Sequence, residues 1–241
     1  MLRIRFYQYL LPKLERRLGI GSADLNQKVL LLLINQLQIS DVVIDVGANV
    51  GKFSKSIRML NPHRKISAVE PQPELAALLR QVIGENGSVY SVGCGESKSE
   101  LKLFRSEVSD SKATLDSSRS ENYVQVKIET LESILLLESF KQIGILKVDT
   151  EGYDFEVLKG LNSIWETSPP KIIIFEIMWR SLVFDNQPID IGKYLQSKGY
   201  NFFYRTSPYL GLVPISAKLK NEDVKTQNIV VTREQLNLGR K

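Results

Sequence analysis

The chain has 241 residues, of which 43% are hydrophobic and 24% are charged, and its formal net charge is +5. This is an ordinary globular composition, and the length is sufficient for one large α/β domain with a full core. The excess of positive charge is mild and spread along the chain, without a basic run interleaved with aromatic residues, so we expect no nucleic-acid partner.

Histidine and cysteine each occur once, as His63 and Cys94. A single cysteine excludes an intramolecular disulfide, and the first residues lack the apolar region and cleavage site of a signal peptide, so we expect a cytoplasmic protein. We interpret His63 as a solvated turn residue. A histidine-based zinc site and a Ser-His-Asp triad are therefore excluded, and acid–base chemistry falls to Asp, Glu, Lys or Tyr. Oxygen ligands alone could hold a divalent metal, but nothing requires one, and we predict no metal site.

The first 40 residues carry apolar side chains at helical spacing with basic residues around them, which predicts two helices, the second over 24–37. We expect residues 1–40 to form a helical cap or extension that packs on the core domain, residues 41–241, or on a second copy of the chain. The alternative is that the basic amphipathic helix contacts a membrane surface. The longest apolar run in this segment, Val29 to Ile34, is too short to span a bilayer.

A strand, a glycine turn and a helix are predicted in succession over 42–60. The apolar run ends near Asp45, and the turn follows as Gly47, Ala48, Asn49, Val50 and Gly51. Gly47 and Gly51 have no Cβ, so a ligand can approach the backbone closely. The spacing fits neither a P-loop nor a dinucleotide fingerprint. S-adenosylmethionine (SAM) fits best, because it has no phosphate and its positive charge suits a nearby acid. The alternative is that the turn has only a structural role and binds no ligand.

A second predicted strand, 65–70, ends in Glu70, 25 residues after Asp45. A carboxylate at the end of the second strand can accept both ribose hydroxyls of an adenosyl group, as in nucleotide-binding βαβ units. Pro71 then stops the strand and allows the helix over 73–83 to begin. The alternative is that Glu70 is only an acid at a helix N-terminus.

The rest of the chain alternates between strands and helices, which predicts a doubly wound, mostly parallel sheet with right-handed crossovers. Ligands in such sheets bind outside the carboxyl ends of the strands. Residues Ser106 to Asn122 are predicted to be a flexible loop, and 206–223 a long connection. Further strands are predicted over 88–92, 101–104, 123–130, 143–149, 171–177, 200–205 and 227–232, and helices from 130, after Asp149 as far as Gly160, and over 188–198.

Polar residues near the carboxyl ends of two of these strands are candidates for the site. An otherwise apolar strand would not carry Lys147 and Asp149 at its end without a partner or a task, so we predict a functional role for Asp149. Glu151 follows in the next turn. Glu176 interrupts the apolar run 171–177 near its end and is expected to face the same crevice.

Together these segments resemble the FkbM-type SAM-dependent methyltransferases over roughly residues 41 to 232. The resemblance implies a Rossmann-like class I methyltransferase fold, with a seven-stranded sheet whose last strand, 227–232, runs antiparallel. It also implies methyl transfer, often to a hydroxyl on a sugar, polysaccharide or natural product. The segments that carry it are Asp45–Gly51, Val69–Pro71, Lys147–Gly152, Val157–Gly160 and Phe175–Glu176.

The resemblance also implies roles for residues. The turn Asp45–Gly51 would hold the methionine part of SAM, and Glu70, with Pro71 beside it, the ribose. Asp149 and Glu151 would line the reaction centre, and with no histidine available a carboxylate is the expected base. The candidates are Asp149, then Glu151 and Glu176. The family often has Asp where this chain has Glu132, and Glu where it has Asp154; both exchanges keep the charge.

We therefore predict a SAM-dependent methyltransferase that acts on a hydroxyl of a sugar, polysaccharide, lipid or natural product. Two other readings stay open. One is a nicotinamide-dependent oxidoreductase, which the spacing of Gly47 and Gly51 disfavours. The other is a non-catalytic SAM-binding module or membrane-surface scaffold, which the acids at the strand ends disfavour. A homo-oligomer is compatible with the sequence.

Overall fold

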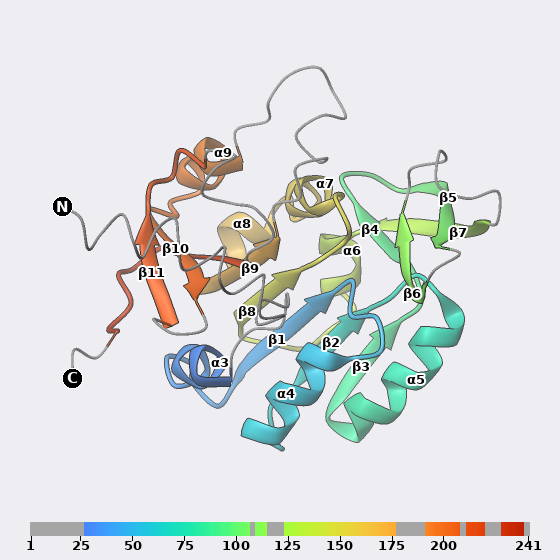
Figure 1. The fold of residues 1–241 in the computed structure, drawn as a ribbon, viewed down its shortest axis with the longest axis horizontal. Coiled ribbons are helices and arrows are strands. Elements are labelled where there is room, and N and C mark those ends of the chain that lie inside the picture. Colours follow the sequence, from blue (N-terminus) through green and yellow to red (C-terminus); the bar gives the residue numbers. More distant parts are fainter. Residues whose placement is uncertain are drawn as a thin grey trace, which may run out of the picture.

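The computed structural model describes residues 27–106, 109–114, 123–176, 191–207, 211–219 and 228–238. Their strands form an eight-stranded central sheet and a second, four-stranded sheet (Figure 1). In spatial order, the central sheet consists of β11 (Gly211–Ile215), β10 (Phe202–Ser207), β12 (Asn228–Thr232), β9 (Ile172–Glu176), β8 (Gln142–Val148), β1 (Asp41–Val46), β2 (Ile66–Val69) and β3 (Gly87–Tyr90).

The central sheet is parallel from β9 to its edge at β3. Strands β9, β8, β1, β2 and β3 pair in parallel, while β12 runs antiparallel to both of its neighbours, β9 and β10. Strand β1 is buried at every position, and β8 at all but its first, as expected for parallel strands covered on both faces. The predicted Rossmann-like class I fold, with an antiparallel strand near one edge, is confirmed.

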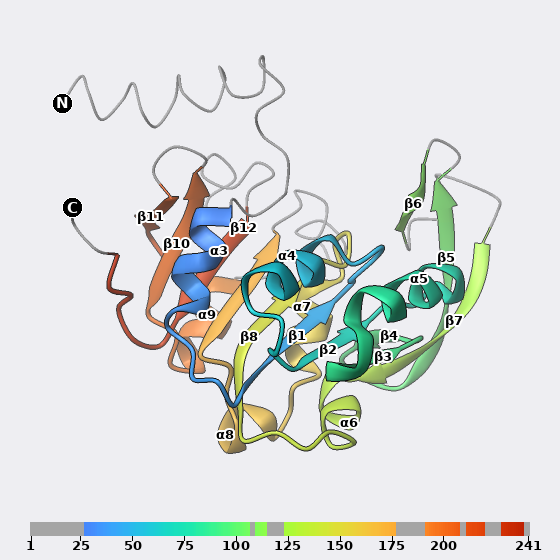
Figure 2. The same cartoon turned by 90° about the horizontal axis from the view of Figure 1, so that it is seen from below.

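Helices cover both faces of the central sheet (Figure 2). One core cluster joins α3, α4 and α5 to one face, and another joins α6, α7, α8 and α9 to the opposite face. A short 3-10 helix, Gly84–Asn86, follows α5. The helices are α3 (Gln27–Ile34), α4 (Lys52–Leu60), α5 (Pro73–Ile83), α6 (Leu131–Leu135), α7 (Asp154–Lys159), α8 (Ile164–Thr167) and α9 (Ile191–Ser197).

The predicted strand count of seven is wrong, because β11 lies within the segment 206–223 that was expected to be a connection. It pairs antiparallel with β10, with Phe203 opposite Ile215. Pro214 lies within β11, and a proline in a short run argues against a strand. As the outermost strand, however, β11 has one side on which a backbone N–H is not needed, so proline is tolerated there.

The second sheet stands beyond the carboxyl ends of β1 and β2 (Figure 1). Its strands are, in spatial order, β4 (Gly93–Gly95), β7 (Tyr123–Thr130), β5 (Ser99–Ser106) and β6 (Ser109–Thr114). The predicted loop over 106–122 is therefore wrong for β6, which pairs antiparallel with β5. The composition of β6 is polar, but an edge strand is held by backbone hydrogen bonds and needs no apolar side chains of its own. Residues 107–108 and 115–122 of the predicted loop lie outside the described residues.

Helix α3 lies in 27–40, the described part of the predicted N-terminal extension. Val29, Leu30 and Leu33 are at most 1% exposed and pack in the same core cluster as Val43 of β1 and Ile57 of α4. The first predicted helix of the extension, with the basic residues around it, falls in 1–26, outside the described residues. In the part of the chain that the structure describes, no helix is long and apolar enough to cross a membrane.

Candidate functional site

A pocket opens at the carboxyl ends of β1, β2 and β8, where the fold places ligand sites. Its empty space, open solvent included, is about 800 Å³. Six of the residues predicted to form the site line it: Gly47, Asn49, Glu70, Pro71, Asp149 and Glu151. The structure thus brings together residues as far apart in the sequence as 47 and 151.

The turn after β1 is fixed to both neighbouring strands. The N–H groups of Gly47 and Ala48 donate to the carbonyl oxygen of Val69, at 2.9 and 3.0 Å. Gly47 has a φ of +72°, and a Cβ placed on it would lie 2.0 Å from the carbonyl oxygen of Asp149. Glycine is required here because the turn touches the backbone after β8. That contact sets Asp149 beside the turn.

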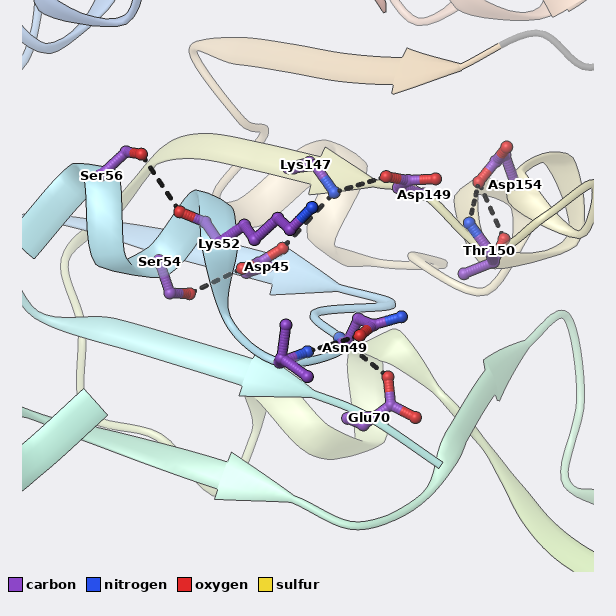
Figure 3. Close-up of polar contacts among 11 residues, drawn as sticks. Asp45, Asn49, Lys52, Ser54, Ser56, Glu70, Lys147, Asp149, Thr150 and Asp154 are labelled. Carbon is purple, nitrogen blue, oxygen red and sulfur yellow. Dashed lines mark hydrogen bonds and ion pairs between the residues drawn. The ribbon is translucent and has the colours of Figure 1, made fainter. Parts of the chain in front are cut away.

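Glu70 and the turn form one hydrogen-bonded unit (Figure 3). Glu70 is 4% exposed, and its Oε2 accepts from the N–H of Asn49 at 2.9 Å, while Oε1 accepts from the N–H of Gln72 at 2.9 Å. Burial raises the pKa of Glu70, and the two N–H donors oppose that rise. The side chain of Gln72 is a third donor, and because each carboxylate oxygen offers more than one lone pair, Glu70 keeps acceptor capacity for a ligand hydroxyl.

Three of the predicted cofactor-binding residues, Asp45, Ala48 and Gly51, are not among the described residues that line the pocket. Asp45 is fully buried, and its Oδ2 accepts from the hydroxyl of Ser54 on α4 at 2.6 Å. A Cβ on Gly51 would lie 2.8 Å from Cδ1 of Leu79 on α5. Asp45 and Gly51 thus contact α4 and α5, which pack behind the turn. The structure does not place Asp45, Ala48 or Gly51 where a ligand in the pocket would touch them.

A charged row links β1 to the end of β8 (Figure 3). The Nζ of Lys147 lies 3.0 Å from Oδ2 of Asp149 and 3.7 Å from Oδ1 of Asp45. Burial would lower the pKa of Lys147, but the two carboxylates outweigh it and the pKa is raised. The side chain of Asp149 is 30% exposed and lines the pocket. Asp149 is therefore an ion-paired carboxylate with access to a ligand.

The turn after β8 presents Thr150 and Glu151 to the pocket and is held by Asp154 beneath it. Oδ1 of Asp154 accepts from both the N–H and the hydroxyl of Thr150, each at 2.8 Å. Glu151 has a φ of +53°, an uncommon backbone conformation for a residue with a side chain. Burial raises the pKa of Asp154 to about 7.

Replacing Asp154 with asparagine is expected to change the pH dependence of stability. The native state holds the Asp154 proton up to about pH 7, whereas an unfolded aspartate releases it near 3.8. Between those values the native state binds more protons, so the free energy of unfolding falls as pH rises, by up to about 4 kcal/mol. Urea unfolding at pH 5 and pH 8 should show wild type losing stability relative to Asp154→Asn. Equal changes in the two proteins would contradict this role.

Glu176, the third predicted catalytic residue, is not brought to the pocket. It is half-buried at the end of β9, opposite Asn228 of β12. Strand β9 lies one strand further from β1 than β8 does, whereas the pocket extends the other way, toward β2 and the second sheet. The sequence correctly predicted that Glu176 lies at the end of a strand. It did not predict on which side of β8 the pocket opens.

Sequence reasoning missed the apolar wall of the pocket. Leu103 of β5 and Val126 and Ile128 of β7 line it, together with Val92 and Cys94. The alternation of apolar residues predicted both strands but not that they form a separate sheet over the crevice. In the part of the chain that the structure describes, no group of three or more His, Cys, Asp or Glu residues is placed to hold a metal ion.

Comparison with known sequences finds one family. A sequence profile described as methyltransferase FkbM domain matches residues 45–202. Methyltransferase sdnD of Sordaria araneosa is 27% identical over 169 residues, which cover 55% of this chain and 65% of that protein. Methyltransferase 1 of Beauveria bassiana is 24% identical over 144 residues, which cover 50% of this chain and 58% of that protein. The match thus spans less than two thirds of the length of either relative.

Solved structures with a similar arrangement are more remote. A TehB-like SAM-dependent methyltransferase from Corynebacterium glutamicum is 12% identical, with a TM-score of 0.46, over 95% of this chain and 98% of that chain. An O-methyltransferase from Bacillus cereus in complex with SAH (S-adenosylhomocysteine) is 13% identical, with a TM-score of 0.44, over 92% of this chain and 87% of that chain.

Proposed function

The chain belongs to the FkbM family of SAM-dependent methyltransferases, and from that premise we propose that it methylates a hydroxyl on a sugar, polysaccharide, lipid or other natural product. The observation that carries this proposal is the pocket at the carboxyl ends of β1, β2 and β8. There, the carboxylates of Glu70 and Asp149 flank the turn at Gly47.

The residues of the pocket fit SAM. Glu70 would accept from the ribose hydroxyls, and the turn at Gly47 and Asn49 would hold the methionine part. Leu103, Val126 and Ile128 line the pocket and would offer an apolar wall to the purine. The bound cofactor supplies a methyl group on a sulfonium, which is an activated leaving group.

The protein's own contribution is positioning and removal of one proton. With SAM bound, the pocket residues would hold the acceptor hydroxyl against its methyl group, and a carboxylate of this chain would take the hydroxyl proton. Asp149 is the proposed proton acceptor, because it lines the pocket and is partly exposed. Glu151 is the second candidate. Glu176 lies outside the lining and has no role in the proposed reaction.

Replacing Asp149 with asparagine is expected to lower turnover by about 100-fold or more, the range typical of losing a general base. Affinity for S-adenosylhomocysteine should stay within a few-fold, because the ribose and turn contacts are untouched. The measurement is methyl transfer from labelled SAM, first across a panel of sugars, polysaccharides and lipids and then on the best acceptor. Glu176→Gln is the comparison variant, with turnover near that of wild type. A large loss in Glu176→Gln with normal turnover in Asp149→Asn would move the base to Glu176.

Membrane contact through the N-terminal segment is a separate proposal. It rests on the basic residues between 1 and 26, which lie outside the described residues. Co-sedimentation with anionic liposomes, comparing the intact chain with a chain lacking residues 1–26, tests it. Equal sedimentation of the two would contradict it.

A further inference from the structure

Lys147 is a charged residue in a buried strand, and it is not among the described residues that line the pocket. Its side chain is 10% exposed and lies between two carboxylates, those of Asp45 and Asp149. Burial of an unpaired charge lowers the stability of the folded protein, and Lys147 has two carboxylates beside it.

The backbone register accounts for the first pair. Asp45 on β1 is the register partner of Lys147 on β8, so their side chains leave the sheet on the same face. Helix α4 covers that face: Ser54 donates to Asp45, and the ring of Phe53 lies 5.6 Å from the Lys147 Nζ. Asp45 is thus buried at a fixed distance from Lys147.

The acids around Lys147 come from three parts of the chain. Asp45 comes from β1, Asp149 follows β8, and Asp154 begins α7. The three differ in their contacts, because Asp45 and Asp149 form ion pairs with the Lys147 Nζ, whereas Asp154 accepts from Thr150. Of the three, Asp149 is the one that lines the pocket and has a direct hydrogen bond from the Lys147 Nζ, at 3.0 Å.

We propose that Lys147 is a positioning residue for the methyl transfer: it holds Oδ2 of Asp149, with Asp45 buried on its other side, and leaves the rest of the Asp149 carboxylate to the pocket. This rests on the proposed function. A charge-assisted hydrogen bond from a buried donor restricts the rotation of the Asp149 carboxylate more than water would. This restriction orients the carboxylate before it accepts the proton.

The test uses two non-reactive ligands and so needs no acceptor. S-adenosylhomocysteine has a neutral thioether, whereas sinefungin carries a protonated amine at the position of the methyl sulfonium. A well-placed, ionised Asp149 favours sinefungin. Calorimetry on wild type, Lys147→Met, Asp149→Asn and the double variant measures the ratio of the two affinities. We expect each single variant to lower the preference for sinefungin by about tenfold.

The double variant decides whether Lys147 acts through Asp149. We expect Asp149→Asn/Lys147→Met to lose no more than Asp149→Asn alone, and Lys147→Arg to recover most of the preference. Additive losses, or a preference that rises when the cation is removed, would overturn the proposal. Should Lys147→Met fail to fold, Asp45→Asn/Lys147→Met removes both buried charges and is expected to show the same loss. Wild-type protein that binds neither ligand would instead overturn the proposed function.

Discussion

Gly47→Ala is expected to weaken binding of S-adenosylhomocysteine by at least about 100-fold and to lower stability. The added Cβ would lie 2.0 Å from the carbonyl oxygen of Asp149. Because this oxygen belongs to the backbone, the clash can be relieved only if the backbone of the turn or of Asp149 moves. It would also sit at a φ of +72°, where a residue with a side chain is strained by about 1–2 kcal/mol. Separation of the turn from β8 would change the spacing between the turn and Asp149, and with it the pocket.

Gly84→Ala is the matched control. Gly84 has a φ of +64°, but a Cβ there meets nothing within 4 Å. With a ψ of −158° as well, Gly84 lies in a backbone region almost confined to glycine. This variant therefore carries backbone strain without the clash, and should lose about 1–3 kcal/mol of stability with unchanged affinity. Calorimetry and thermal unfolding on both variants separate the two effects. Wild-type affinity in Gly47→Ala would show that the contact between the turn and Asp149 does not shape the ligand site.

Glu70→Gln is expected to weaken binding of S-adenosylhomocysteine by about 30-fold, since hydrogen bonds to a charged group contribute about 1.5–3 kcal/mol. The carboxylate accepts from the N–H groups of Asn49 and Gln72 on opposite oxygens. An amide keeps one oxygen and turns its NH₂ toward one of those donors, so it also loosens the turn.

The ribose role of Glu70 is tested with a second ligand, the 2′,3′-dideoxy analogue of S-adenosylhomocysteine. Glu70→Gln should lower the affinity for this analogue much less than that for S-adenosylhomocysteine, because the analogue lacks the hydroxyls from which Glu70 is proposed to accept hydrogen bonds. Glu74→Gln, on the exposed side of α5, is the control for a charge change on the surface. Equal losses for both ligands would mean that Glu70 acts only by holding the turn.

The positions of Glu70 and Asp149 could be predicted from the sequence because both acids end apolar runs. The carboxyl ends of neighbouring parallel strands meet at one edge of a sheet, so their convergence follows from the strand order. Asp45 could not be assigned in the same way. It lies within β1, and its side chain points to the face that α4 covers rather than to the open edge.

The position of Glu176 shows a second limit. Sequence alone places it at a strand end, but the pocket is closed by the second sheet on the side of β2, away from β9. Strands β6 and β11 were missed for a common reason. Both are edge strands, held by backbone pairing, so the polar composition of β6 and Pro214 in β11 gave no apolar pattern to recognise.

Calorimetric titration of the protein with S-adenosylhomocysteine, with NADH as the control ligand, tests the central claim most directly. We predict micromolar binding of S-adenosylhomocysteine and no heat of binding with NADH. Absence of S-adenosylhomocysteine binding, or binding of NADH in its place, would contradict the assignment of the pocket formed by Glu70, the Gly47 turn and Asp149 to SAM.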